Sequence, residues 1–305
     1  MSSAQDRRRS VLVTGASRGL GRAIAIQIAA NGFPVWAGVR SPQAKAEIEE
    51  LARTRSLPLQ ALLLDVTSEG SVTAACQTIR ETDGRLYGLV NNAGVTGRAF
   101  FEDYPEDMIR KIFEVNLFGV MRVTRCALPL LRANGSGRII NISSIGGRIG
   151  SNSVSPYVAS KFGLEGFSES LAIELTPFQI AVSIVSPGII KTDIWDEGNR
   201  ILPEARNAHS PYYEYFWRME QYAEKLLHSS RLQPEDVAVK VASLLNERNP
   251  KLRHIVGRRA ALVVWLRKHL PDRVFEAVYF GQIARLMRAR EPDRSGSAPS
   301  HRTIS

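Results

Sequence analysis

The feature that most constrains the fold of this chain is a glycine-rich turn between a short apolar run and a helical pattern. Residues 10–14 are rich in β-branched side chains and predict a buried strand. The turn, Gly15-Ala16-Ser17-Arg18-Gly19-Leu20-Gly21, follows at once, and residues 22–30 have helical apolar spacing. Glycines let the backbone approach a ligand, and the amides of a helix N-terminus attract anions. The turn is compatible with a site for a pyrophosphate group and with a tight turn that binds no ligand. The other motifs distinguish these two alternatives.

Strand and helix patterns alternate along the rest of the chain. Apolar runs that predict strands occupy residues 34–39, 62–66, 88–90, 138–142 and 181–185. Helical patterns lie between them, including residues 107–131 with Asn116 in the middle. This alternation predicts an α/β fold, a doubly wound parallel sheet of about seven strands flanked by helices in a single domain. Polar groups follow three of the runs, at the sheet edge where ligands bind in such folds: Asp65, residues 91–94 and Ser143-Ser144.

A tyrosine and a lysine four residues apart form the second informative motif. The run Tyr157-Val158-Ala159-Ser160-Lys161 places Tyr157 and Lys161 on one face of a helix, and Ser144 stands thirteen residues before the tyrosine. A neighbouring cation favours the phenolate and lowers the pKa of a tyrosine from about 10 toward working pH. The motif therefore predicts an acid/base catalyst.

The end of the second predicted strand bears on the choice of cofactor. An acidic residue there would bind the ribose 2′-hydroxyl of NAD, whereas a basic one accommodates the 2′-phosphate of NADP. Val39 holds this position, Arg40 follows it, and Arg18 stands in the glycine turn. Two guanidinium groups on one phosphate favour NADP(H). The alternative is that both are ordinary surface arginines of a basic chain.

Taken together, the motifs resemble those of the short-chain dehydrogenase/reductase family. The matching positions keep the family's order over about residues 10–260: residues 14–21, Asp65, residues 91–94, Asn116, Ser144, residues 157–161 and residues 187–192. The resemblance implies a Rossmann-like fold and hydride transfer between NADP(H) and a carbonyl carbon. Leu20 stands where the family often has Ile, and every catalytic position is kept.

The resemblance also implies roles for single residues. Tyr157 is the general acid or base, and Lys161 lowers its pKa and binds the nicotinamide ribose. Ser144 holds the substrate oxygen, and Asn116 kinks a helix and anchors a water that leads protons to the lysine. The residues implied in cofactor binding are Gly15, Ser17, Arg18, Gly19, Leu20, Gly21, Arg40, Asp65, Val66, Asn92, Ala93, Gly94, Tyr157, Lys161, Pro187, Gly188, Ile190 and Thr192.

Composition excludes several classes of protein. The 305 residues carry 40 Lys and Arg against 30 Asp and Glu, a net charge of +10, but the basic residues are dispersed and match no nucleic-acid module. No stretch approaches the roughly 18 apolar residues of a membrane span, and the polar, basic residues 1–9 lack the apolar core of a secretory signal. Cys76 and Cys126 lie in helical patterns without metal-ligand spacing. We expect a cytoplasmic protein that binds neither nucleic acid nor metal.

An insertion over residues 193–233 separates the sixth predicted strand from a helix that opens at Pro234. In the family this segment covers the substrate cleft. Five aromatic residues crowd into residues 212–217, and an aromatic lid would suit a bulky, lipophilic substrate. The same rings would equally serve to pack the lid onto the body or onto a second subunit. The residues expected to touch substrate are Ser144, Trp195, Tyr212 and Phe216.

The C-terminal part differs in character from the rest. Residues 261–290 carry two basic amphipathic helical patterns, and residues 291–305 have the composition of a disordered tail. Helices of this kind can cap the substrate pocket, form a dimer interface or lie on an anionic membrane surface. The extension is similar to that of retinol- and hydroxysteroid-type members of the family. Because dimers and tetramers are common in the family, we expect a homodimer or homotetramer.

These observations lead to one expected function and two alternatives. We expect an NADP(H)-dependent oxidoreductase that interconverts a ketone or aldehyde and an alcohol on a fairly large lipophilic substrate, which is steroid-, retinoid- or lipid-like. The first alternative is a pathway-specific ketoreductase of a biosynthetic route, which would have the same catalytic residues. The second is a non-catalytic NADP-binding regulatory protein.

Overall fold

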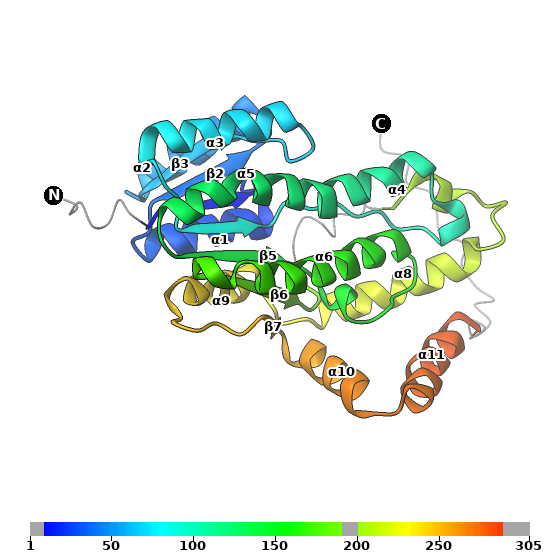
Figure 1. The fold of residues 1–305 in the computed structure, drawn as a ribbon. Coiled ribbons are helices and arrows are strands. Elements are labelled where there is room, and N and C mark those ends of the chain that lie inside the picture. The colour runs from blue at the N-terminus through cyan, green and yellow to red at the C-terminus, as the bar shows by residue number, and fades with distance from the viewer. Residues whose placement is uncertain (1–8, 191–200, 289–305) are drawn as a thin grey trace, which may run out of the picture.

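Seven parallel strands form one sheet at the centre of the molecule (Figure 1). The computed structural model describes residues 9–190 and 201–288. The strand order is β3-β2-β1-β4-β5-β6-β7, and every neighbouring pair is parallel. This order confirms the doubly wound sheet predicted from the sequence. The strands are β1 (Val11–Thr14), β2 (Val35–Val39), β3 (Leu59–Leu63), β4 (Gly88–Asn91), β5 (Gly137–Ile142), β6 (Ile180–Pro187) and β7 (Arg253–Val256).

Two strands differ from the prediction. The run over residues 62–66 was expected to be the third strand, but β3 ends at Leu63, so Asp65 lies in the connection that follows. The sequence does not predict β7, because this strand is short, half-buried and begins with Arg253 and His254. Alternation of an apolar and a polar face, the usual sign of such a strand, is absent from its four residues.

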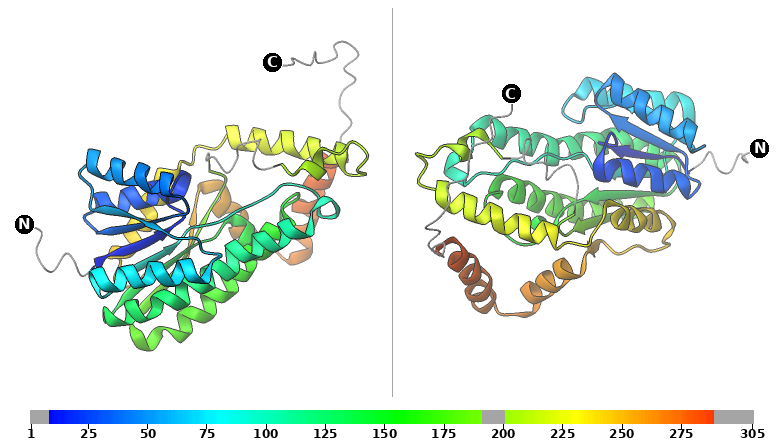
Figure 2. Two further views of the ribbon diagram at one scale, coloured as in Figure 1. Left: turned by 90° about the horizontal axis from the view of Figure 1, so that it is seen from above. Right: turned by 180° about the vertical axis from the view of Figure 1, so that it is seen from behind.

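Helices cover both faces of the sheet (Figure 2). Val11 and Val13 of β1 point into one core and Leu12 into the other, which explains the continuous apolar run of this strand. The helices that pack on the first face are α1 (Gly19–Ala30), α2 (Pro42–Thr54) and α9 (Pro234–Asn246). The helices that pack on the second are α3 (Glu69–Asp83), α5 (Gly119–Ala133) and α6 (Ser155–Glu174).

Local signals in the sequence set the ends of these helices. Ser41 and Ser68 accept hydrogen bonds from backbone amides in the first turns of α2 and α3. Gln233 and Asp236 form a capping box, which confirms the predicted start of α9. Gly84 ends α3 with a φ of 70°, a conformation that glycine adopts without strain.

The long helix predicted over residues 107–131 is interrupted in its middle. α4 (Glu106–Phe113) passes into a π-helical turn, η3 (Glu114–Phe118), from which α5 continues. Asn116 lies in this turn and is fully buried. Such turns are rare and concentrate at functional sites.

The remaining elements connect the layers or lie outside them. The 3₁₀ turns are η2 (Phe101–Asp103), η4 (Ile145–Gly147), η5 (Thr176–Phe178) and η7 (Pro203–Arg206). α8 (Tyr213–His228) belongs to the predicted insertion, while α10 (Arg258–His269) and α11 (Asp272–Arg288) form a V that projects from the body (Figure 1). The predicted N-terminal lead, apart from Arg9, and the predicted tail lie outside the described residues, as do residues 191–200 of the lid region. In the described ranges, no helix is long and apolar enough to cross a membrane.

A buried ion pair fixes α8 to the body. Arg98, in the connection after β4, and Glu220 on α8 approach to 2.6 Å between Nε and Oε2. Their side chains are only 7% and 2% exposed. Because little water reaches either group, the attraction between the two charges is only weakly screened.

We therefore expect Glu220→Ala to lower the free energy of unfolding by about 3–5 kcal/mol, because it removes a counter-charge from the buried Arg98 guanidinium. The double variant Arg98→Met/Glu220→Met should lose less than this single variant. Urea unfolding measures both. Glu106→Ala, which breaks an exposed pair with Arg110 (70% and 78% exposed), is the control and should cost less than about 1 kcal/mol. A loss in Glu220→Ala as small as that of the control would contradict the prediction.

Candidate active site

The glycine-rich turn is held against the segment that follows β4. The Thr14 hydroxyl accepts hydrogen bonds from the backbone amides of Asn92 and Ala93, both at 3.0 Å. The Asn92 side-chain amide donates to the carbonyl oxygens of Thr14 (3.0 Å) and Gly15 (3.2 Å). Two motifs far apart in the sequence, residues 14–21 and 91–94, are thus joined at the carboxyl edge of the sheet.

This turn tolerates only glycine at two places. Gly15 has a φ of +66°, and a Cβ there would lie 2.9 Å from the Ala93 Cα. A Cβ on Gly21 would collide with the carbonyl oxygen of Gly15 and with the Asn92 side chain. The two strands of chain in the turn therefore pack closely. Because no side chain projects from these glycines, a ligand can approach the backbone.

The start of α1 fits the pyrophosphate of a dinucleotide. α1 begins at Gly19 directly after the turn, and no described side chain caps its first turn. Its first amides consequently remain available to an anion, and the helix dipole favours negative charge at this end. Ser17 and Arg18 belong to the same turn, and Arg18 is exposed.

Asp65 and Arg40 lie near each other at the far side of the turn. Burial alone would raise the pKa of Asp65, but hydrogen bonds from the Thr67 amide and hydroxyl and the charges of Arg40 and Arg122 together lower that pKa. Arg40 is exposed and follows β2 directly, and Val66 is buried. An exposed guanidinium beside Asp65 stands where the sequence predicts a group for the ribose end of the cofactor.

Asn116 connects three elements of the site. Its Oδ1 accepts a hydrogen bond from the Val95 amide (2.8 Å), and its Nδ2 donates to the Val95 carbonyl oxygen (2.9 Å) and to the Ser160 hydroxyl (3.1 Å). Ser160 in turn donates to the carbonyl oxygen of Tyr157 at 2.7 Å. A Cβ on Gly94 would lie 3.4 Å from Asn116 Oδ1 and 3.9 Å from Lys161 Nζ. The π-helical turn thereby brings Asn116 to the first turn of α6.

Tyr157, Ser144 and Lys161 meet at the start of α6. Ser144 and Tyr157 lie side by side against Gly146, where a Cβ would be 3.5 Å from the Ser144 Oγ and 3.6 Å from the Tyr157 ring. The Lys161 Nζ donates to the carbonyl oxygen of Ile142 at 2.9 Å and lies 5.7 Å from the centroid of the Tyr157 ring. The structure brings together the three residues that the sequence motif selects.

The two ionisable groups of this trio have shifted pKa values. Burial lowers the pKa of Lys161 from 10.5 to about 8, and the charge of Glu165 partly offsets that effect. Burial also raises the pKa of Tyr157, and the neighbouring Ser144 side chain partly offsets this increase. The direction for Tyr157 is opposite to the one expected from a nearby lysine, because desolvation of the phenolate outweighs other effects here.

Ser143, the residue before Ser144, is placed differently from Ser144. The Ser143 hydroxyl is buried and lies against Gly147, where a Cβ would approach it to 2.6 Å. Ser144 instead accepts a hydrogen bond from the Gly146 amide at 3.1 Å, next to Tyr157. This geometry favours Ser144 as the residue that meets a substrate.

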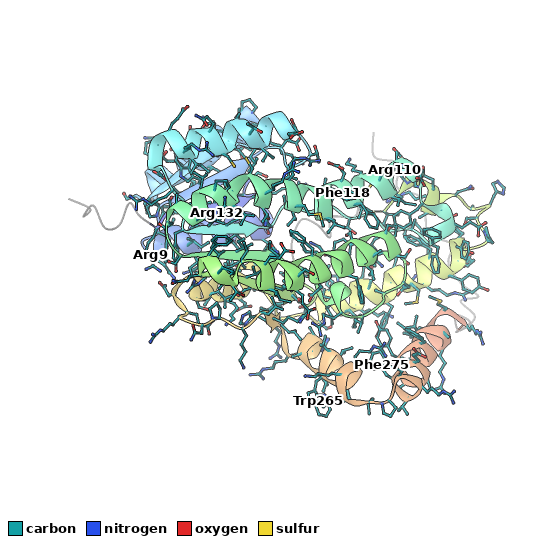
Figure 3. All side chains as sticks on the ribbon, viewed as in Figure 1. Arg9, Arg110, Phe118, Arg132, Trp265 and Phe275 are labelled. Carbon is teal, nitrogen blue, oxygen red and sulfur yellow. The ribbon has the colours of Figure 1, made fainter. Side chains whose placement is uncertain are left out.

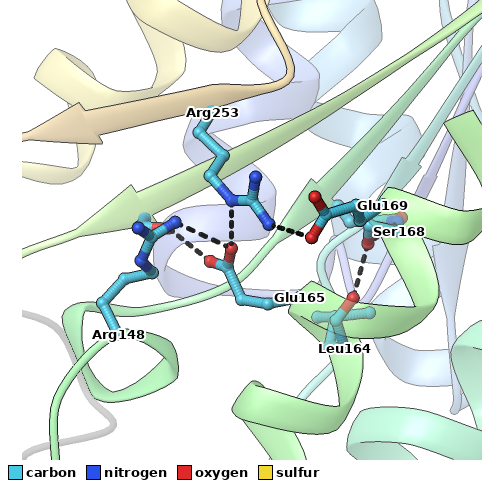
Figure 4. A network of polar contacts seen from close by, with 8 residues as sticks. Arg148, Leu164, Glu165, Ser168, Glu169 and Arg253 are labelled. Atoms are coloured by element: carbon cyan, nitrogen blue, oxygen red, sulfur yellow. Dashed lines mark hydrogen bonds and ion pairs between the residues drawn. The ribbon is translucent and has the colours of Figure 1, made fainter.

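A carboxylate that the motifs do not single out lies one helical turn beyond Lys161. Glu165 is 5% exposed, and its Oε2 accepts from Arg148 Nη1 (3.4 Å) and Arg253 Nε (3.0 Å) (Figure 4). Its Oε1 accepts from the Ser186 hydroxyl at 3.1 Å. Arg253 also donates to Glu169 at 2.7 Å. The network joins α6 to the segment after η4, to β6 and to β7. The spacing Lys161–Glu165 on one helix face is the signal that was available in the sequence.

The loop after β6 lies at the same edge of the sheet. Pro187 ends β6, and the Gly188 amide donates to the Val256 carbonyl oxygen at 2.9 Å. A Cβ on Gly188 would lie 3.1 Å from the Ala260 Cβ, and Ile190 is buried. Two predicted site residues, Thr192 and Trp195, lie outside the described residues.

The aromatic residues of the lid region pack on the body. The rings of Tyr212 and Phe100 stack with centroids 5.2 Å apart, and Phe216 meets Phe100 edge to face at 6.4 Å. Phe216 is fully buried, and Tyr157 packs against the same cluster. Phe216 therefore lies inside the aromatic cluster behind Tyr157, whereas Tyr212 is half-buried at the edge of that cluster.

Several known proteins are similar to this chain over most of its length. The model of the short chain dehydrogenase family matches residues 9–201. An uncharacterized oxidoreductase, YusZ of Bacillus subtilis (strain 168), is 36% identical over 270 residues, which cover 88% of this chain and 95% of the relative. Retinol dehydrogenase 5 of Mus musculus is 34% identical over 284 residues, which cover 88% and 86%.

Solved structures agree with the fold. A short-chain dehydrogenase from Streptomyces avermitilis is 33% identical with a TM-score of 0.74, covering 91% of this chain and 98% of the other. Two solved structures of lower sequence identity are similar to this chain in fold only. An alcohol dehydrogenase of Thermococcus sibiricus (23% identical, TM-score 0.66) is complexed with 5-hydroxy-NADP, and a protein of Burkholderia phymatum (22%, 0.74) is in complex with NAD.

The lowered pKa of Lys161 predicts that this residue destabilises the fold. Below about pH 8 Lys161 is protonated in both states, and the folded state bears the full cost of burying the charge. Between about pH 8 and 10.5 the folded state loses the proton first, so the cost disappears as the pH rises. We expect Lys161→Met to raise the free energy of unfolding near neutral pH by about 2–3 kcal/mol, with a smaller gain near pH 10.

Urea unfolding at the two pH values measures this gain. Lys225→Met, which replaces an exposed lysine of α8, is the control and should change stability little at either pH. A Lys161→Met variant that is less stable than the wild type at neutral pH, or a gain that grows with pH, would show that the buried ammonium is not the source of the cost.

Proposed function

This chain belongs to the short-chain dehydrogenase family, and from that membership we propose that it is an NADP(H)-dependent enzyme that interconverts a ketone or aldehyde and an alcohol. Membership itself makes the chain an oxidoreductase that acts on CH–OH groups. The observation that carries the proposal is the placement of Ser144 and Tyr157 side by side, with the buried ammonium of Lys161 5.7 Å from the centroid of the Tyr157 ring. Such a group can hold a substrate oxygen and exchange a proton with it.

The residues at the sheet edge fit a nicotinamide dinucleotide. The amides at the start of α1 would hold the pyrophosphate, and Asp65 and Arg40 would lie at the adenosine end. Asn92, Ala93 and Gly94 would line the same side, and Pro187, Gly188 and Ile190 would lie toward the nicotinamide. When bound, the cofactor supplies or accepts the hydride.

In the reductive direction the chain's own residues handle the oxygen and the proton. Ser144 donates a hydrogen bond to the carbonyl oxygen and stabilises the charge that develops on it. Tyr157 gives its hydroxyl proton to the same oxygen, and its raised pKa keeps that proton in place until it is needed. The ammonium of Lys161 then stabilises the phenolate that remains. Asn116 positions the start of α6 through Ser160.

Two exposed arginines support NADP(H) over NAD(H). Arg40 follows β2 directly and acts on Asp65, and Arg18 stands at the start of α1. No acidic residue holds the position of Val39 at the end of β2. A 2′-phosphate between two guanidinium groups would gain charge-assisted hydrogen bonds that a 2′-hydroxyl does not.

The substrate that we propose is large and lipophilic. Phe100, Tyr212 and Phe216 form an aromatic cluster behind Tyr157, and the half-buried rings of Phe100 and Tyr212 would present its apolar surface to a substrate. Retinol dehydrogenase 5, whose name states a lipophilic alcohol as substrate, covers 88% of this chain. NADPH oxidation with ketones from small aliphatic to retinoid and steroid size tests the proposal, and turnover confined to the small ketones would reject it.

Replacement of the proposed acid should separate chemistry from binding. We expect Tyr157→Phe to lower turnover by about 10²–10⁴-fold while NADPH binding changes less than severalfold, because only the proton is lost. Ser144→Ala should also lower turnover, whereas the matched control Ser143→Ala should retain most of it. Steady-state kinetics and NADPH fluorescence titration measure these effects. Full turnover in Tyr157→Phe would eliminate the proposed acid.

The cofactor preference has its own test. We expect Arg40→Asp to shift the ratio of kcat/KM for NADPH over NADH at least tenfold toward NADH, since the new carboxylate repels a 2′-phosphate and can bind a 2′-hydroxyl. Arg53→Asp on the outer part of α2, where Arg53 is 76% exposed, is the control with the same charge change. An equal shift in both variants, or none in Arg40→Asp, would mean that Arg40 does not reach the cofactor.

A further inference from the structure

The helices α10 and α11 expose large apolar side chains to solvent. A helix that packs on one side of a body normally presents polar residues to water on the other. Here four large apolar side chains, spaced three or four residues apart within each helix, are between 46% and 63% exposed: Leu262, Trp265, Val274 and Val278. In Figure 3 Trp265 lies at the outer edge of α10. We call these four residues the outer apolar face.

The inner side of the same helices is already used by the body. Ala260, Val264 and Phe275 are buried. The Tyr279 hydroxyl donates to the Gly150 carbonyl oxygen at 3.1 Å. Arg218 of α8 donates to the Met287 carbonyl oxygen at 3.0 Å. The helices are therefore held in place from within, and the outer apolar face is a second surface of the same helices.

Basic residues surround the outer apolar face. The segment from residue 258 to residue 288 has seven Arg and Lys against two acids, so about a tenth of the chain holds a charge of +5 out of a total of +10. One of the acids, Asp272, is paired with Arg267 at 2.7 Å. The exposed basic residues are Arg258, Arg259, Lys268, Arg273, Arg285 and Arg288.

From this combination we propose that the outer apolar face docks on the surface of an anionic phospholipid bilayer. Apolar side chains enter the boundary between headgroups and acyl chains, while the basic residues around them meet lipid phosphates. No crossing of the bilayer is involved, in accordance with the length and polarity of the described helices.

Charge argues against two other occupants. A second copy that met this face symmetrically would place a net charge of +5 against another +5, which is repulsive. Residues 289–305 also complement the face poorly, since they contain Ile304 as their one large apolar residue and three arginines against two acids. An anionic bilayer supplies both an apolar interior and negative charge.

The docking inference is independent of the proposed reaction, because it is tested without cofactor or substrate. The full chain is sedimented with vesicles of phosphatidylcholine alone and with vesicles that also contain phosphatidylglycerol. We expect at least tenfold stronger binding to the anionic vesicles, with most of that difference lost in high salt. Absence of binding to the anionic vesicles, or equal binding to both, would overturn the proposal.

Variants locate the binding surface. Trp265→Ser/Val278→Ser should lower vesicle binding at least tenfold, and because both side chains are 55% and 63% exposed the fold should be retained. The matched control is Ile173→Ser/Val239→Ser, which removes two apolar side chains that are 74% and 54% exposed on α6 and α9. Equal binding by the two double variants would overturn the proposal. So would wild-type dimers that dissociate in Trp265→Ser/Val278→Ser without vesicle binding, since the face would then be a subunit interface.

Discussion

The buried ammonium of Lys161 is the constraint on which the rest of the site depends. A charge removed from water requires partners at fixed positions, and each partner here comes from a different element. The carbonyl oxygen of Ile142 at the end of β5 accepts its hydrogen bond, Gly94 leaves room beside Nζ, and Glu165 provides a counter-charge within α6. Glu165 is itself held by Arg148, Arg253 and Ser186, so the sheet edge, α6 and the last strand are tied to the placement of one cation.

The glycine turn and the Tyr157 cluster are two ends of one edge of the sheet. The first is shaped by backbone, because Gly15 and Gly21 leave no room for a Cβ and Asn92 clamps the turn. The second is shaped by side chains, since Ser144, Tyr157 and Asn116 are placed through hydrogen bonds. A backbone cradle suits the invariant phosphates of a cofactor, whereas a cluster of side chains suits chemistry that has to be tuned.

Much of this arrangement can be predicted from the sequence, and the exceptions have physical reasons. Continuous apolar runs identify β1, β2, β4, β5 and β6, because strands buried on both faces need apolar residues throughout. β7 contains Arg253 and His254 and is half-buried, so it lacks that pattern. The apolar pattern does not show the π-helical turn at Asn116, since one extra residue in a turn changes no residue type, and only the family resemblance implies a kink there. From the sequence, Glu165 is indistinguishable from an ordinary helical glutamate. Its role depends on Arg148 and Arg253, which only the fold brings to it.

The ion pair between Arg98 and Glu220 has a consequence for how α8 would separate from the body. Attraction between two charges is strong only while water is excluded, since it weakens as the local dielectric constant rises. Departure of α8 admits water, water weakens the pair, and the weaker pair holds α8 less firmly. Each step promotes the next, so we expect α8 to separate in an all-or-none manner rather than by gradual loosening. The ion pair thus acts on the cooperativity of this separation as well as on its free energy.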